Sequence, residues 1–496
     1  MRIGELIAFI LYLAGMLGIG ISLFIKKKNA SDKDFFLGGR NMNPWVVAIS
    51  AQASDMSGWL LMGLPGSIMA LGMGQVWIAI GLLIGTILNW IFTAPRLRAF
   101  SQAAGDAITV PQYLNGRFFS KGKSLQVISA LVFLVFFAVY AASSFKACGE
   151  LFHTVLGMDP IWATVIAAVI IIGYTFLGGF SAVCWTDFFQ GMLMLVAVML
   201  APILAWKAVA AGEGAAAVEL TENYWNLLPS GKLDWASWKE ILSGLAWGLG
   251  YFGMPHILVR FMSISKTSEI KRSRTVATVW IVLAMGAAVC VGLVGKPFLG
   301  EIANTEHVFI EMVRKIFSAL PFVSGILLSA ILAAAMSTAD SQLLVSASAF
   351  ASDVYKPILR KNASDKEMMN VSRLVVVVIA VVALLIALDP NSANIMGLVS
   401  NAWAGFGSSF GPVILLSLFW KKMTYKGAVA GIVVGAVVDI AWMILLTGST
   451  GIYELLPGFL AGLIAAVVVS ILDKKNVPAE TEALFAEANA LLNEKE

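Results

Sequence analysis

Thirteen apolar segments alternate with polar stretches along the 496-residue chain. The charge-free run from Leu6 to Ile25 is 20 residues long, enough to cross a hydrocarbon core of about 30 Å. Only helices and closed barrels span lipid, and runs this long and uniformly apolar favour helices. The segments lie near 4–25, 43–63, 69–93, 124–149, 160–178, 185–207, 237–258, 275–297, 321–345, 370–388, 393–419, 426–447 and 453–472. The pattern predicts an all-α membrane protein with thirteen transmembrane helices.

The composition agrees with a membrane protein and argues against other classes. Hydrophobic residues make up 59% of the chain and charged residues 13%, about half the usual share for a soluble domain. The net charge is +4 and the basic residues are dispersed, which argues against nucleic-acid binding. The three cysteines and three histidines show no metal or redox spacing, and no nucleophile–base pair indicates an enzyme.

Lysine and arginine residues concentrate in alternate loops. One set of loops, together with the end of the last segment, carries Lys26, Lys27, Lys28, Lys33, Arg40, Arg96, Arg98, Arg117, Lys121, Lys123, Arg260, Lys266, Lys271, Arg272, Arg274, Lys356, Arg360, Lys361, Lys366, Lys421, Lys422, Lys426, Lys474 and Lys475. The opposite loops hold few basic residues, among them Lys232, Arg314 and Lys315. The positive-inside rule therefore predicts an outside N-terminus and a cytoplasmic C-terminus. An odd number of helices agrees with this orientation.

Two segments contain residues that weaken helices. The second holds the polar run 51–59 followed by Gly63, Pro65 and Gly66, and the seventh holds Gly244, Gly248, Gly250, Gly253 and Pro255. Such breaks free backbone groups, which is tolerated at membrane depth where they line a cavity or lie buried in protein. Small residues also permit close helix packing, so one break alone would be ambiguous. Two breaks five helices apart predict an inverted repeat with a binding site near the midplane.

The repeats divide the chain into six parts. The two repeats of five helices occupy 43–207 and 237–419, with an extracellular loop at 208–236 between them. The first helix and a cytoplasmic loop occupy 1–42, two C-terminal helices 420–475, and a cytoplasmic tail 476–496. The loops 208–236 and 298–320 are long enough to hold short helices. The tail predicts a short acidic amphipathic helix after Pro478, whose simplest role is to solubilise the chain end.

Four carboxylates lie within apolar segments, where an isolated charge is costly. Asp55 sits beside the first break, so we expect it to face a polar interior and to function there. Asp187 lies near the cytoplasmic end of the sixth segment, where a simple interfacial position is equally consistent. Asp340 lies in the ninth segment. Asp439 lies in the twelfth, outside both repeats, and the sequence suggests no role for it.

Ala334, Ser337 and Thr338 of the ninth segment are spaced i, i+3, i+4 and share one helix face. Hydroxyl oxygens opposite the free carbonyls of a broken helix suit a hard monovalent cation such as sodium. Hydroxyls can also bond back to their own helix, and spacing alone slightly favours that interpretation. In the seventh segment Trp247 and Tyr251 share a face beside Gly248 and Gly250, where small neighbours leave room for a ligand.

Five stretches resemble the solute:sodium symporter family, and the resemblance covers nearly the whole chain. They are Leu-Gly-Gly-Arg (37–40), Ala-Ser-Asp-Met-Ser-Gly-Trp-Leu-Leu-Met-Gly-Leu-Pro-Gly (53–66), Tyr-Thr-Phe-Leu-Gly-Gly-Phe-Ser-Ala-Val-Cys-Trp-Thr-Asp (174–187), Gly-Leu-Ala-Trp-Gly-Leu-Gly-Tyr-Phe-Gly-Met-Pro-His-Ile-Leu (244–258) and Ala-Met-Ser-Thr-Ala-Asp-Ser-Gln-Leu-Leu (335–344). The second and fourth are particular to the proline-carrying branch of the family. The resemblance implies a leucine-transporter-type fold with one extra helix before the repeats and two after them, in a bacterial cytoplasmic (inner) membrane.

The resemblance also implies roles for individual residues. A sodium ion would be held by the carbonyls of Ala53, Met56 and Ala334 and the hydroxyls of Ser337 and Thr338. The substrate site would comprise Asp55, which would support sodium coupling, with Trp59, Gly63, Tyr140, Trp247, Tyr251 and Pro255. Arg40 would act at the cytoplasmic gate. The best-known bacterial proline carrier has Ser at the position of Asp340, so Asp340, Ser341 and Asp187 are a candidate second sodium site.

Together these features predict sodium-coupled uptake of L-proline by alternating access. Sodium would stabilise the outward-open state by bridging the second and ninth segments, and proline would then bind at the break. One alternative is the same fold carrying another small solute, such as a different amino acid, a sugar or a vitamin. Another is a membrane-embedded proline sensor, against which the lack of a signalling domain argues. Sodium, L-proline and the lipid bilayer are the expected partners, and no obligatory protein partner is indicated.

Overall fold

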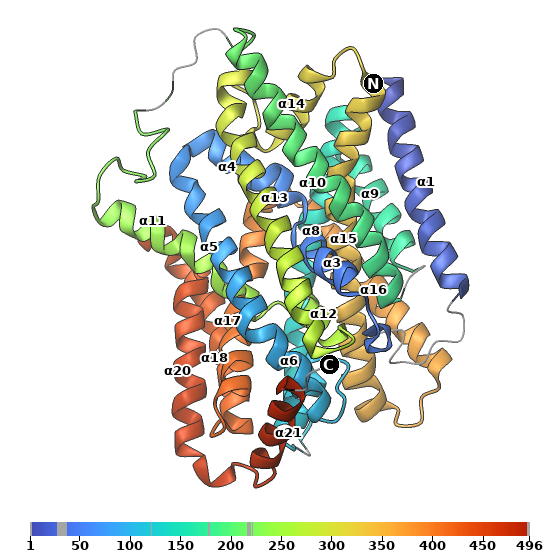
Figure 1. Ribbon diagram of the computed structural model, residues 1–496, viewed down its shortest axis with the longest axis vertical. Helices are drawn as coiled ribbons and strands as arrows, with labels where there is room; N and C mark the ends of the chain where they lie inside the picture. Colours follow the sequence, from blue (N-terminus) through green and yellow to red (C-terminus); the bar gives the residue numbers. More distant parts are fainter. Residues whose placement is uncertain are drawn as a thin grey trace.

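The computed structural model describes residues 2–26, 37–120, 122–176, 179–215, 220 and 222–493, and these form an all-helical protein (Figure 1). Across these residues the one β-type pairing is an isolated bridge between Met42 and Ile264. The start of α1 and the helix α21 lie at opposite ends of the long axis. Lys27, Lys28, Lys33 and Lys121, which contributed to the predicted orientation, lie outside the described residues.

Ten stretches of the described chain are long and apolar enough to cross a membrane. Nine of them contain the helices α1 (Ile3–Lys26), α8 (Ser124–Leu156), α10 (Phe180–Ala210), α13 (Ile270–Leu299), α15 (Pro321–Ala349), α16 (Asp365–Leu388), α17 (Ile395–Phe419), α18 (Tyr425–Leu445) and α20 (Leu455–Leu472). The tenth joins η3 (Met73–Gln75), α5 (Val76–Leu88), the π-helical turn η4 (Asn89–Thr93) and α6 (Ala94–Ala103). The helix α9 (Pro160–Thr175) is apolar but shorter.

Two further segments are broken helices, at the positions that the glycines and proline predict. In the first, α3 (Pro44–Asp55) ends before a π-helical turn, η2 (Trp59–Gly63), and α4 (Leu64–Leu71). In the second, α11 (Trp235–Ala246) leads into a 3-10 turn, η5 (Trp247–Phe252), and α12 (Pro255–Ser263). Pro255 lacks an amide hydrogen, so it can start α12 but could not continue a helix from η5 without losing a hydrogen bond.

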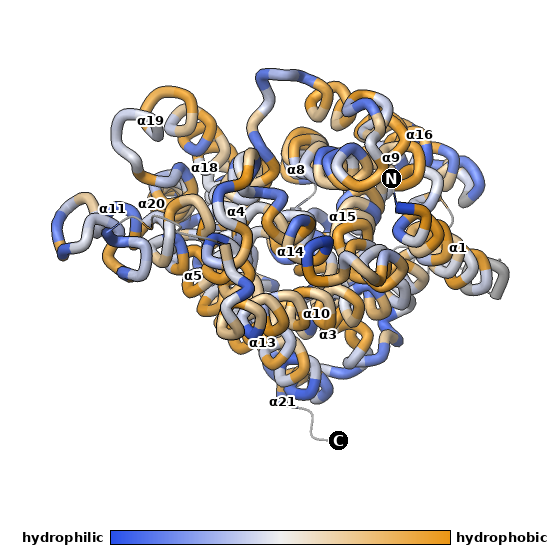
Figure 2. Tube along the Cα trace, turned by 90° about the horizontal axis from the view of Figure 1, so that it is seen from above, coloured by the Kyte–Doolittle hydropathy of each residue, from blue (hydrophilic) through white to orange (hydrophobic). Residues whose placement is uncertain are grey.

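The two breaks pack inside the helix bundle. The helix α15 runs through its middle, with every residue from Leu327 to Ala349 buried, and contacts α1, α3, α8 and α10. By contrast, α16 leaves large apolar side chains such as Leu374 and Leu385 exposed. Figure 2 shows strongly hydrophobic stretches on many of the peripheral helices, among them α1, α5, α13 and α16. Such a surface is suited to lipid and unsuited to water.

A seam of glycines joins α5 to the second broken helix. A Cβ atom added at Gly85 would lie 2.2 Å from the carbonyl oxygen of Gly248, and one at Gly81 would lie 2.3 Å from that of Gly244. These distances are far below van der Waals contact, so only glycine permits the two backbones to approach this closely. The seam holds α5 directly against η5.

The sequence placed some boundaries wrongly. The third segment was expected at 69–93 but its helical run extends to Ala103, because Arg96 and Arg98 continue the helix beyond the apolar stretch. The loop 298–320 does contain short helices, η7 (Thr305–His307) and α14 (Val308–Ile316), whereas the described part of 211–234 is turn and coil. The tail does form a helix, α21 (Thr481–Asn493), but one face of it is buried against α6.

Candidate functional site

The first break places Asp55 at the centre of an aromatic cluster. The Tyr251 hydroxyl donates to Asp55 Oδ2 at 2.6 Å. Trp59 Nε1 and the Tyr140 hydroxyl donate to the main-chain oxygen of Asp55 at 3.1 and 3.2 Å. All four side chains are buried, and they come from the two broken helices and α8. Four of the residues expected at the substrate site therefore lie together.

The remaining expected substrate residues border the same two breaks. Gly63 closes η2, where an added Cβ would lie 3.3 Å from the side chain of Met396 on α17. Pro255 is the first residue of α12. Trp247 begins η5, and its ring stacks on Tyr453 with the ring centroids 5.1 Å apart.

The expected sodium ligands lie between the end of α3 and the middle of α15. Ser337 Oγ donates to the carbonyl oxygen of Ala53 at 2.9 Å and contacts that of Ala334 at 3.2 Å. The Thr338 hydroxyl is buried without a hydrogen-bond partner. Met56 is the C-cap of α3, so the last carbonyls of this helix lose their intrahelical partners. Several neutral oxygens from two elements, one of them unpartnered, form a donor set that fits sodium.

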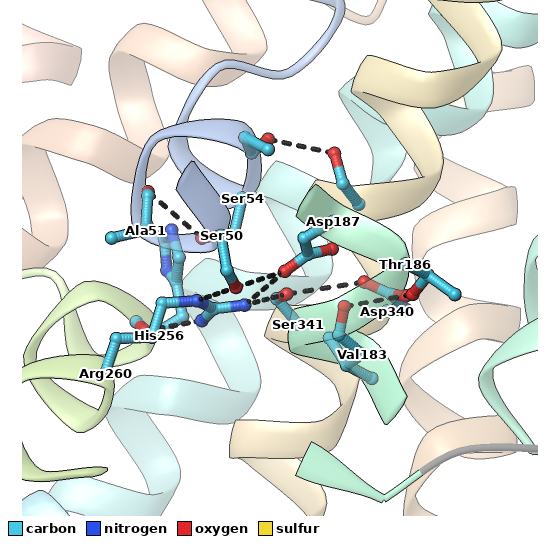
Figure 3. Close-up of polar contacts among 12 residues, drawn as sticks. Ser50, Ala51, Ser54, Val183, Thr186, Asp187, His256, Arg260, Asp340 and Ser341 are labelled. Atoms are coloured by element: carbon cyan, nitrogen blue, oxygen red, sulfur yellow. Dashed lines mark hydrogen bonds and ion pairs between the residues drawn. The ribbon is translucent and has the colours of Figure 1, made fainter. Parts of the chain in front are cut away.

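The residues of the candidate second sodium site surround a guanidinium group (Figure 3). Arg260 Nη2 donates to Asp187 Oδ2 at 2.8 Å and to Ser341 Oγ at 2.6 Å. Arg260 Nε donates to Ser50 Oγ at 2.7 Å, and Ser341 Oγ donates to Asp340 Oδ1 at 3.3 Å. The site therefore contains an internal cation from α12. Sequence reasoning counted Arg260 only as a loop charge.

Arg40, expected at the cytoplasmic gate, joins three segments. Arg40 Nε pairs with Asp106 Oδ1 at 2.7 Å, and Nη2 donates to the carbonyl oxygen of Ala107 at 2.7 Å. Nη1 donates to the carbonyl oxygen of Met262, at the end of α12, at 2.6 Å and to Ser101 Oγ, on α6, at 3.1 Å. Burial lowers the pKa of Arg40 below its usual range, while Asp106 opposes this shift. We refer to these five residues as the Arg40 cluster.

Away from the Arg40 cluster, the loop that carries η7 packs over the first broken helix and the start of α17, a contact that we call the opposite closure. Glu306 accepts hydrogen bonds from the amides of Met396 and Ile395, at the start of α17, at 3.1 and 3.4 Å. The backbone of this loop also packs on the first broken helix, because a Cβ at Gly66 would lie 2.8 Å from Glu306 Cα. Burial raises the pKa of Glu306 above its usual range, while the two amides oppose this shift. His307 pairs with Glu150 of α8 at 3.1 Å.

Sequence reasoning missed Tyr453, Trp403 and Glu306. Trp403 Nε1 donates to the main-chain oxygen of Trp247 at 2.7 Å, and its ring meets that of Tyr251 edge-on at 5.0 Å. These residues come from α17, η7 and the turn before α20, and they adjoin the breaks only in three dimensions. Glycines do follow Trp403, at Gly405 and Gly407, and Gly451 precedes Tyr453, but nothing in the sequence connects these stretches to the two breaks.

Comparisons with known proteins identify the family of the chain and neighbours with the same fold. A model described as the sodium:solute symporter family matches residues 35–435. A sodium/proline symporter of Escherichia coli is 43% identical, covering 98% of this chain and 96% of its own length. A high-affinity proline transporter, PutP, of Bacillus subtilis is 44% identical, with coverages of 93% and 97%. The structure of a Na⁺-coupled sialic acid symporter shares the fold, with a TM-score of 0.75 at 20% identity over 95% of this chain and 98% of its own.

Proposed function

Because the chain belongs to the sodium:solute symporter family, we propose that it takes up L-proline together with sodium by alternating access. The observation that carries this proposal is the full-length similarity to relatives named for sodium-coupled proline transport. The family consists of membrane transporters and not enzymes. The ten long apolar helical stretches in the described part of the chain agree with a multi-pass protein of a bacterial membrane.

Sodium binding would tie the first broken helix to α15. The carbonyls of Ala53, Met56 and Ala334 and the hydroxyls of Ser337 and Thr338 would hold the ion, and Ser337 already bridges the two elements. The ion would stabilise the arrangement in which these oxygens converge, since a ligand favours the conformation that it binds best. This arrangement would present the break around Asp55 to proline.

Proline would lie between the two breaks. Its carboxylate requires donors, which amides near Gly63 would supply. Its ammonium requires acceptors or aromatic faces, which the carboxylate of Asp55 and the rings of Tyr251 and Trp247 would provide. Tyr140, Trp59 and Pro255 would form the apolar wall for its ring. Asp55 also connects this site to sodium, because it directly precedes Met56.

The membrane arrangement is part of the proposal. Thirteen crossings would comprise the ten long helices, the two broken ones and α9, with repeats at 43–207 and 237–419. The loop 208–236 and the N-terminus would lie outside. The loop within 1–42, the tail 476–496 and the ends of the helices in 420–475 that carry Lys421 and Lys474 would face the cytoplasm. The separation of α1's start from α21 along the long axis supports termini on opposite sides.

Radiolabelled uptake into proteoliposomes tests the proposed function. Purified protein is reconstituted with an inward sodium gradient, an inward proton gradient or no gradient, and L-proline accumulation is compared with protein-free liposomes. Accumulation with the sodium gradient alone is expected. Accumulation of a sugar or another amino acid in place of proline would overturn the substrate, and binding of proline without flux would indicate the sensor alternative.

A further inference from the structure

The tail helix α21 is docked on α6, the helix that contributes Ser101 to the Arg40 cluster. Thr481, Leu484, Phe485 and Ala488 are each at most 3% exposed, while Glu487 and the other residues of the opposite face are open to solvent. The buried face lies against α6, with a smaller contact to the turn at Thr267–Glu269. Figure 1 shows α21 beside α6, at the end of the molecule away from α14. A tail that only solubilised the chain end would need no such buried face.

Phe485 enters a pocket formed by three different segments. Its ring meets the ring of Phe100, on α6, edge-on at a centroid distance of 4.8 Å. The guanidinium of Arg117, from α7 (Val110–Arg117), lies 4.8 Å from the Phe485 ring centroid, and Lys421 Nζ, beyond the end of α17, lies 5.7 Å from it. Both distances are within the range of cation–π attraction. Lys421 also pairs with Glu482, but both groups are largely exposed and water screens this pair.

The same three segments are joined beneath Phe485. Arg117 Nε donates to the carbonyl oxygen of Ser417, on α17, at 2.9 Å. Arg96 Nε, on α6, donates to the carbonyl oxygen of Leu418 at 3.0 Å. Phe485 therefore covers a seam between α6, α7 and the end of α17. Any relative displacement of these segments changes the shape of its pocket.

The helix α6 also contributes to the Arg40 cluster, the expected site of the cytoplasmic gate. Its Ser101 belongs to the Arg40 cluster, and its Arg98 donates to the carbonyl oxygens of Ile264 and Ser265, just past α12. Arg98 and Ser101 on α6 thus contact the segment at the end of α12 and the Arg40 cluster, while Phe100 on the same helix contacts α21. The Phe485 pocket and the Arg40 cluster share this helix as a structural support.

We propose that α21 is a clasp on the cytoplasmic gate, in which Phe485 is a positioning residue that favours the gate-closed arrangement. The pocket is complete when α6, α7 and the end of α17 are placed as they are with the Arg40 cluster closed. Docking of α21 therefore shifts the conformational equilibrium toward closure, because binding favours the state with the better-formed site. This role rests on the proposed transport cycle but is measurable without transport.

Cysteine reactivity measures the equilibrium directly. In a background with Cys148, Cys184 and Cys290 replaced by Ala, one reporter is Ser263→Cys, buried beside Met262 at the gate. The other is Met396→Cys at the opposite closure. Phe485→Ala should raise labelling of Ser263→Cys from the cytoplasmic side about fivefold or more and lower labelling of Met396→Cys from the outside. Phe485→Tyr, which keeps the ring, should restore both rates.

The controls separate a clasp from a general loss of structure. Glu487→Ala changes an exposed residue of the same helix and should leave both reporters at wild-type rates. Partial unfolding would raise both rates, and that outcome would overturn the proposal. So would unchanged reactivity of Ser263→Cys in both Phe485→Ala and a chain lacking residues 481–496. Neither readout requires proline flux, so failure of the transport proposal would leave this test intact.

Discussion

Arg260 Nη2 lies 2.8 Å from Asp187 Oδ2, and neither side chain is more than 1% exposed. Asp340 reaches the same guanidinium through Ser341, so two carboxylates share one internal cation in this conformation. Two nearby carboxylates repel each other unless a cation or proton lies between them. Asp187 Oδ1 and Asp340 Oδ2 are buried without a hydrogen-bond partner, so a sodium ion at this site would bind beside the Arg260 guanidinium or displace it.

The first prediction concerns this candidate second sodium site. If a second ion is carried there, Asp340→Ser removes one of its carboxylates and should lower the number of charges moved per proline. The charge-to-proline ratio in proteoliposomes held at a set membrane potential measures this number. If both wild type and Asp340→Ser move one positive charge per proline, no second sodium ion is transported and the candidate second site is ruled out as a transport site.

The second prediction concerns the proposed sodium ligands on α15. Thr338→Ala removes a buried hydroxyl without a protein partner, and Ser337→Ala removes the bridge to Ala53. Each should raise the sodium concentration for half-maximal proline uptake, with near-normal protein levels. Ser346→Ala is the matched control, because that hydroxyl bonds only back to Gln342 within the helix. Unchanged sodium dependence in both ligand variants would refute the site.

The third prediction concerns proline recognition. Trp247→Ala should weaken proline affinity by about 1–3 kcal/mol, the range for a lost apolar contact, which is about 5- to 150-fold in half-saturation. Sodium affinity measured without proline should change much less. Trp238→Ala removes a half-exposed ring from the same broken helix and should change neither value. Wild-type half-saturation in both Trp247→Ala and Tyr251→Ala would rule out their proposed role.

The fourth prediction concerns the closure opposite the Arg40 cluster. Glu306→Gln keeps the side-chain size but replaces a charged acceptor of the Ile395 and Met396 amides with a neutral one. Charge-assisted hydrogen bonds are the stronger kind, so this closure should loosen. Labelling of Met396→Cys from outside should increase about fivefold. The exposed Glu301, changed to Gln, is the control, and equal labelling of both variants would contradict the role of Glu306.

The fifth prediction tests the orientation. Ser364, at the N-terminus of α16, and Ser392, in the turn before α17, lie at opposite ends of one proposed crossing. A cysteine at 364 should react with a membrane-impermeant reagent only from the cytoplasmic side, and one at 392 only from outside. Labelling of both from the same face of oriented vesicles would show that the thirteen-helix arrangement is wrong.

The sequence identified the features that depend on local residue types. The breaks at Asp55 and at Trp247–Phe252 follow from glycine, proline and polar residues at membrane depth, and both are where the pattern predicted them. The α15 hydroxyls were located by spacing, although spacing alone could not distinguish a site from back-bonding. In the structure Ser337 bonds both to its own helix and to Ala53 across the gap.

Long-range contacts explain what the sequence could not provide. Arg260 fits the positive-inside pattern as an ordinary loop charge, and only the packing of α12 against α3 and α15 brings it to Asp187 on α10. The tail sequence predicts an amphipathic helix, but only the structure shows that α6 covers its apolar face. Asp439 is another case: Ser408 Oγ donates to it at 3.0 Å, which satisfies a buried carboxyl between α17 and α18 but reveals no role in transport.

The glycine seam between α5 and η5 has a mechanical consequence. The two backbones touch directly, with no side chains between them. Because closely packed groups tolerate neither voids nor overlaps, we expect η5 and α5 to move together. The helical run from Met73 to Ala103 is continuous over 31 residues, about 46 Å at the usual rise per residue. Gly248 of η5 packs against this run at Gly85, and Ser101, a member of the Arg40 cluster, lies near its far end. If proline displaces η5, the helical run would therefore move with it and shift Ser101 at the proposed cytoplasmic gate. This coupling requires no series of side-chain rearrangements between the two sites.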